Sequence, residues 1–123
     1  MGLDIHFFSG EKQKERVDYD TQVGYFRKIN SLFRWVSYNV QSVDNCKSIL
    51  IPKQKLEQLS ADLNRLTKDN CMTIFPTEDG FFFGSIEYDQ YYWSDVEEVK
   101  SWVSSTLKSF DFDNHDLFFW AWW

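Results

Sequence analysis

Three consecutive phenylalanines, Phe81 to Phe83, stand between Gly80 and Gly84 and lead into a segment rich in tyrosine and aspartate. Leaving three phenyl rings in water would forfeit roughly 1.5–3 kcal/mol of burial each, which argues against a surface loop. Glycine on either side permits backbone angles or close approaches that a Cβ would forbid. We therefore expect residues 80–95 to form a corner of the core, a pocket wall or a partner surface, with the rest of the chain organised around them.

Aromatic residues make up 20% of the 123 residues, with 12 Phe, 6 Trp and 6 Tyr. Such a core rests on a few large rings rather than on many aliphatic side chains. The 2 prolines and 5 glycines are too few for a disordered chain or a turn-dense all-β sandwich. Because there is neither a linker nor an internal repeat, residues 1–123 are predicted to form a single domain.

In the first third of the chain, the spacing of apolar residues changes from that of a strand to that of a helix. Residues 2–8 alternate in the manner of a strand, and residues 9–22 are polar and without a period, as in a loop. Three/four spacing of apolar residues then predicts a helix of about five turns over residues 23–43. One flank of this helix is expected to carry three polar side chains: Arg27, Asn30 and Arg34.

The middle of the chain predicts a short strand, a second helix and a hairpin. Residues 49–51 are the strand, and Pro52 suits the first turn of the helix. Residues 72–75 and 81–83 are expected to pair as a hairpin, with turn chemistry supplied by Asp79-Gly80. The second helix is expected to bury a narrow seam of leucines: Leu56, Leu59, Leu63 and Leu66.

A third helix follows, capped by Asp89 or by Ser94, the latter with Glu97 in a capping box. Residues 117–123 are apolar on both faces and predict a strand beside residues 2–8, with one face on the core. The other face is expected to meet helices, a partner or a second copy in a homodimer. The predicted fold is α+β, with three helices on a small, mainly antiparallel sheet whose N- and C-terminal strands are adjacent.

Charge is distributed unevenly. Residues 1–68 hold 11 Lys/Arg and 8 Asp/Glu, a balance of +3, and residues 69–123 hold 2 and 11, a balance of −9. Direct nucleic-acid binding by the second half is therefore unfavourable, whereas a basic partner or a plain solubilising surface fits. Cys46 and Cys71 are expected to be free thiols of a cytoplasmic protein. The chain shows no leader, no apolar run of about 18 residues, and His6 breaks a myristoylation motif.

Two blocks resemble a family of small proteins encoded by bacteriophages and prophages. They are Tyr25-Phe26-Arg27-Lys28-Ile29-Asn30, followed by Trp35, and Gly80-Phe81-Phe82-Phe83-Gly84-Ser85, followed by Tyr88-Asp89 and Tyr92. The likeness covers most of the chain. That family has no established activity, so the resemblance implies a genomic context rather than a chemistry. Its members often carry a histidine where this chain has Phe33.

Catalytic chemistry finds little support among the residues. A metal site would need His6 and His115 to converge, with Asp4 and Asp113 or Asp116 beside them. Ser85 has no adjacent base or nucleophile elbow, and the glycines are not followed by the Lys-Ser/Thr of a phosphate loop. Paired carboxylates around Glu87 and Asp89 fit acid–base work, and fit a helix N-terminus better.

A binding site is the better prediction. The aromatic side chains can stack on a ring of a ligand, and Ser85 and Asp89 can select the ligand by hydrogen bonding. The cations Arg27 and Lys28 and the amide of Asn30 can hold an anionic group of that ligand. The candidate site residues are Arg27, Lys28, Asn30, Phe82, Ser85, Tyr88, Asp89, Tyr92 and Trp93.

The leading hypothesis is a non-enzymatic phage or prophage accessory protein without a cofactor. It would bind a host protein or sequester a small anionic ligand, such as a nucleotide signal, in counter-defence. One alternative is a small nucleotide- or carboxylate-processing enzyme using Asp89 with Arg27. Another is a purely structural oligomer.

Overall fold

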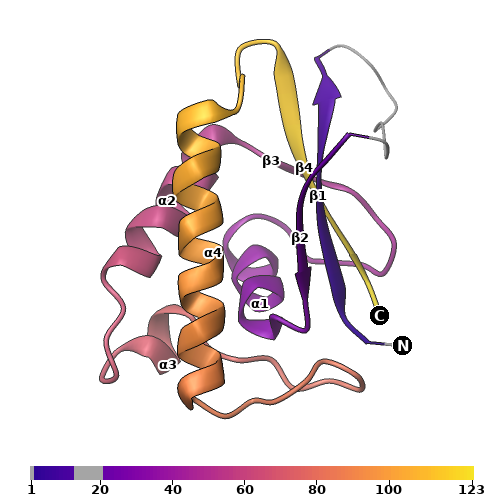
Figure 1. Ribbon diagram of the computed structural model, residues 1–123. Helices are drawn as coiled ribbons and strands as arrows, with labels where there is room; N and C mark the ends of the chain where they lie inside the picture. The colour runs from indigo at the N-terminus through magenta and orange to yellow at the C-terminus, as the bar shows by residue number, and fades with distance from the viewer. Residues whose placement is uncertain (1, 13–20) are drawn as a thin grey trace.

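The computed structural model describes residues 2–12 and 21–123 (Figure 1). Four strands form one antiparallel sheet in the order β2-β1-β4-β3, and the α+β fold with adjacent terminal strands is confirmed. The helices all lie on one side of the sheet. The elements are β1 (Asp4–Glu11), β2 (Gln22–Arg27), α1 (Asn30–Asn39), β3 (Ile49–Ile51), α2 (Lys53–Asn64), α3 (Cys71–Ile74), α4 (Gln90–Ser109) and β4 (His115–Trp122).

The core lies between the sheet and the helices. Alternate residues of the two central strands face the helices, and Phe7 of β1 pairs with Phe119 of β4 in register. Trp102 of α4 lies with its ring centroid 4.3 Å from that of Phe7 and 5.6 Å from that of Phe26. These rings therefore join α4 to β1 and β2, as the aromatic composition predicts.

The predicted helix over residues 23–43 is wrong in its first part. Residues 22–27 form β2, in which Phe26 pairs with Ile5, and the chain turns at Lys28 with a left-handed φ of 57°. α1 begins only at Asn30, so Arg27 lies on a strand and does not share a helix flank with Asn30. The spacing of apolar residues gave a wrong prediction here, because the buried residues of a strand, a turn and a helix follow one another at helical intervals.

The predicted polar loop over residues 9–22 is also wrong at both ends. β1 continues to Glu11, and β2 already includes Gln22. Lys12 N–H donates to Asn114 O at 3.1 Å, which ties the end of β1 to the start of β4. The central part of that predicted loop lies outside the described residues.

The predicted hairpin is replaced by α3 and an irregular loop over residues 75–89. Within the aromatic run only Phe83 is buried, while Phe81 is 83% exposed and Phe82 is 46% exposed. The expectation that all three rings avoid water is therefore wrong. Phe82 has a φ of 68°, and its carbonyl accepts from Leu3 N–H at 3.0 Å, so this turn leaves only Phe83 pointing inward. The buried ring packs 4.9 Å from Phe33.

The predicted starts of α2 and α4 agree with the structure. Asp89 caps α4, because its Oδ1 accepts from Tyr91 N–H at 3.0 Å and from Tyr92 N–H at 3.2 Å. The alternative cap at Ser94 is wrong, since that residue lies inside α4. α2 begins directly after Pro52, and Leu56, Leu59 and Leu63 are buried, as predicted. Leu66, the fourth leucine of the predicted seam, lies beyond the end of α2.

β4 lies between β1 and β3, which fixes the two faces of the C-terminal residues. Leu117, Phe119 and Ala121 are buried on the helix side, so the predicted core face is confirmed. Trp122 is exposed on the opposite face, in the same row as Asp4 and Arg27. Both cysteines are free, as expected. None of the helices in the described residues is long and apolar enough to cross a membrane.

Candidate functional site

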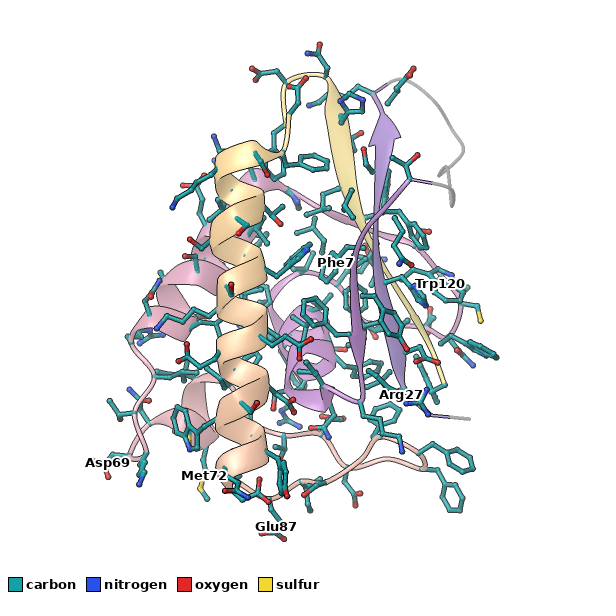
Figure 2. The ribbon with its side chains drawn as sticks, viewed as in Figure 1. Phe7, Arg27, Asp69, Met72, Glu87 and Trp120 are labelled. Carbon is teal, nitrogen blue, oxygen red and sulfur yellow. The ribbon has the colours of Figure 1, made fainter. Side chains whose placement is uncertain are left out.

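A pocket of about 270 Å³ opens at the end of the sheet where β2 turns into α1 and where α4 begins. We call it the corner pocket. Figure 2 shows Arg27 at this end of β2 and Glu87 on the loop that precedes α4. Residues distant in sequence meet here, including six of the nine predicted site residues: Arg27, Lys28, Asn30, Ser85, Asp89 and Tyr92. Phe82, Tyr88 and Trp93 do not line the corner pocket.

Asn30 holds the pocket wall together. Its amide Nδ2 donates to Phe83 O at 3.1 Å and to Ser85 O at 2.9 Å, and its Oδ1 accepts from Glu78 N–H at 3.0 Å. The residue is buried, and these three bonds anchor the irregular loop to the first turn of α1. We therefore interpret Asn30 as a residue that shapes the site, because its polar atoms are already engaged by the protein.

The tyrosine hydroxyls near the pocket are also engaged. Tyr92 OH donates to Phe75 O at 2.8 Å, and burial is the main cause of its raised pKa. Tyr88 OH accepts from Thr77 N–H at 3.0 Å. Tyr91, by contrast, is 68% exposed at the pocket and offers a ring face to solvent. Tyr91 was not among the candidates predicted from the sequence, because only the register of α4 determines which of the adjacent tyrosines is exposed.

Two cations line the wall formed by β2 and the turn after it. Arg27 Nη1 lies 3.3 Å from Asp4 Oδ1, and half of the side chain is exposed. Lys28 is placed by its own backbone N–H, which donates to Leu3 O at 2.7 Å. Gly84, with a φ of 92°, packs so closely that an added Cβ would lie 3.2 Å from Lys28 Cβ. Among the described residues, no carboxylate lies within 4.0 Å of the Lys28 ammonium.

Asp95 is the functional candidate that the sequence analysis missed. It lines the corner pocket from the second turn of α4, and its partly buried carboxyl makes no hydrogen bond or ion pair within the described chain. Burial, then the charges of Glu98 and Asp89, raise its pKa to about 6. Once Asp89 is known to be the cap, the three-residue spacing of Tyr92 and Asp95 places both on one face of α4. That spacing is the signal that could have identified Asp95.

A second depression of about 460 Å³ lies between α1, α2 and α3, and we call it the helix groove. It contains two arginines, but each is already paired. Arg34 Nη1 lies 2.7 Å from Glu78 Oε2, and Arg65 Nη2 lies 2.9 Å from Asp62 Oδ1. The helix groove is larger, yet its cations are neutralised by the protein. The corner pocket is therefore the stronger candidate.

The catalytic arrangements considered from the sequence do not come together. His6 pairs across the sheet with Trp120, whereas His115 pairs with Glu11 at the far end of the same two strands. No group of three or more metal-ligating side chains occurs in residues 2–12 and 21–123. Ser85 Oγ accepts from Glu87 N–H at 3.0 Å, and neither histidine lines its pocket.

Comparison with known proteins does not assign this chain to a family. No protein-family model matches this chain, and no curated protein or solved structure is significantly similar to it.

Proposed function

We propose that this chain is a non-enzymatic phage or prophage accessory protein that holds a small anionic ligand in the corner pocket. The observation that carries the proposal is the exposed Lys28 ammonium, which lies beside Arg27 and makes no ion pair within the described residues. It lies at a pocket lined by two segments far apart in sequence, residues 27–31 and 77–95. A charged donor without a protein partner is available to a phosphate or carboxylate. Sequestration of such a ligand in the bacterial cytoplasm would suit a counter-defence role.

Binding is favoured over turnover because the two residues of the enzyme alternative already interact with other parts of the protein. The enzyme alternative pairs Asp89 with Arg27, but Asp89 caps α4 and Arg27 contacts Asp4. A general base must reach the proton that it abstracts, and a capping carboxylate is held in place by the helix. Turnover of a nucleotide that is lost in Asp89→Asn with the fold retained would establish the enzyme instead.

The proposal predicts that neutralising Lys28 weakens binding of nucleoside monophosphates. Lys28→Gln removes one charge-assisted hydrogen bond, which is worth about 1.5–3 kcal/mol, so the dissociation constant should rise about 10- to 100-fold. Isothermal titration calorimetry measures the change. Lys47→Gln is the matched control, because that lysine is exposed, pairs with Asp44 and lies outside the corner pocket. Equal affinities of wild type and Lys28→Gln would contradict the proposal.

A protein partner is the second candidate, on the sheet face opposite the helices. Tyr25, Leu50 and Trp122 are exposed there on three different strands, and Figure 2 shows Trp120 on this side of the sheet. Apolar side chains gathered on one face favour contact with a host protein or with a second copy of the chain. Sedimentation equilibrium distinguishes the homodimer, since a single species of 14.8 kDa rules it out.

A further inference from the structure

Among the charged side chains that line the corner pocket, Lys28 and Asp95 are opposite in sign and uncommitted within the described residues. Lys28 comes from the turn after β2, and Asp95 comes from α4. Neither makes an ion pair, either with the other or with the rest of the described chain. The Asp95 carboxyl is partly withdrawn from water without a partner, which is unfavourable, and such groups are concentrated where a ligand supplies the missing partner. Lys28 is exposed, so its ammonium is accessible to a ligand. A ligand that satisfies both groups must itself be dipolar.

The charge of the lining favours an anion that also carries hydrogen-bond donors. The lining holds two cations, Arg27 and Lys28, and three carboxylates, Glu87, Asp89 and Asp95. A ligand with only negative charge would be attracted to the cations and repelled by the carboxylates. A ligand with only positive charge would meet the reverse arrangement. The best complement carries an anionic group at one end and hydrogen-bond donors at the other.

The shape of the pocket narrows the chemistry further. Its volume of about 270 Å³ suits a small ligand, and the exposed ring of Tyr91 offers a stacking face at the pocket. Guanine is a planar ring whose Watson–Crick edge presents two adjacent N–H donors, which match the two oxygens of a carboxylate. Adenine presents a donor beside an acceptor on the same edge, and the acceptor would face the carboxylate unfavourably.

Resting on the proposed function, we infer that the corner pocket takes a guanine nucleotide, with the donor edge of the base on Asp95 and the phosphate on Lys28. Arg27 then supports the phosphate from the end of β2, and Tyr91 covers the base. Asp89 keeps its position as the helix cap. Asn30 takes no part in contact with the ligand and maintains the loop that closes the pocket.

This arrangement gives base selectivity a definite pH dependence. The charged groups at the pocket or coupled to Asp95 are Asp89 at the cap of α4, Glu98 of α4, Glu87 of the loop, and Arg27 and Lys28 from the end of β2 and the turn after it. Because the pKa of Asp95 is raised to about 6, its carboxyl is ionised at pH 8 and protonated at pH 5. The ligand phosphate titrates near pH 6 as well, but GMP and AMP share that change. The ratio of the GMP and AMP dissociation constants therefore isolates the contribution of the base to the pH dependence.

The experiment measures dissociation constants of GMP and AMP by calorimetry at pH 8 and pH 5, for wild type and Asp95→Asn. Wild type should prefer GMP about tenfold or more at pH 8, since a charged acceptor meets two donors, and the preference should shrink at pH 5. Asp95→Asn should lose the preference at pH 8 while melting no lower than wild type, because it removes a charge that lacks a partner. Glu98→Gln is the matched control and should keep the preference at pH 8.

Each other outcome overturns the inference. Equal binding of GMP and AMP in wild type refutes the role of Asp95 but leaves the anionic-ligand proposal intact. A GMP preference that survives in Asp95→Asn places the base elsewhere. Failure of both nucleotides to bind at millimolar concentration refutes the inference, and titration of wild type and Lys28→Gln with inorganic phosphate then tests the proposed function separately.

Discussion

Replacing Asn30 by alanine is expected to lower the free energy of unfolding by about 3–5 kcal/mol. The substitution deprives two carbonyls, those of Phe83 and Ser85, and the N–H of Glu78 of their partner; the bond to Phe83 O is buried and the other two are partly buried. Buried polar groups left without hydrogen bonds are among the most destabilising features of a folded protein. Urea denaturation followed by tryptophan fluorescence measures the loss.

Asn45→Ala is the matched control for this prediction. Asn45 also bonds the backbone through both amide atoms, donating to Trp123 O and accepting from Trp123 N–H at 3.1 Å each, but in an exposed position. Water can replace those bonds, so the expected loss is below about 1 kcal/mol. Similar losses for the two variants would show that Asn30 does not anchor the loop.

The second large effect concerns the aromatic core. Phe7→Ala is expected to lower the free energy of unfolding by about 3–5 kcal/mol, through lost burial and the cavity that remains. Phe7 is almost fully buried and contacts the rings of Phe26, Trp102 and Phe119. Thermal and urea unfolding both measure this change.

Phe81→Ala provides the contrast, since the same side chain is removed from an exposed position. Its effect on stability is expected to stay within about 0.5 kcal/mol. A large loss in Phe81→Ala would mean that the aromatic run packs against the core after all. A small loss in Phe7→Ala would contradict the core described above.

Periodicity predicted the parts of the fold in which one face is buried in a regular element. The terminal strands, the strand at Ile49–Ile51 and the helix after Pro52 follow this rule. It failed at β2, because the turn at Lys28 depends on a single left-handed residue that leaves no mark on the spacing of apolar side chains. It failed again at Phe81 and Phe82, since burial of a ring in a loop depends on which way the turn points it.

Six of the nine candidate residues meet at the corner pocket, and some of them make contacts other than those expected from the sequence. Arg27, Lys28 and Ser85 line the corner pocket together, although the sequence placed the first two on a helix. Asn30 and Tyr88 were expected to bind a ligand, but their polar atoms bond the protein. Asp95 was missed because its distinctive feature, a partly buried carboxyl without a partner, depends on how α4 packs at the pocket.

The most direct test of the account is a titration of isotope-labelled protein with GMP, followed by backbone amide chemical shifts. The perturbed amides are expected to gather at the corner pocket, around Lys28, Ser85 and Tyr91, and their shifts are expected to change little in Lys28→Gln at the same GMP concentration. Perturbations gathered instead at the helix groove, around Tyr38 and Arg65, would contradict this expectation.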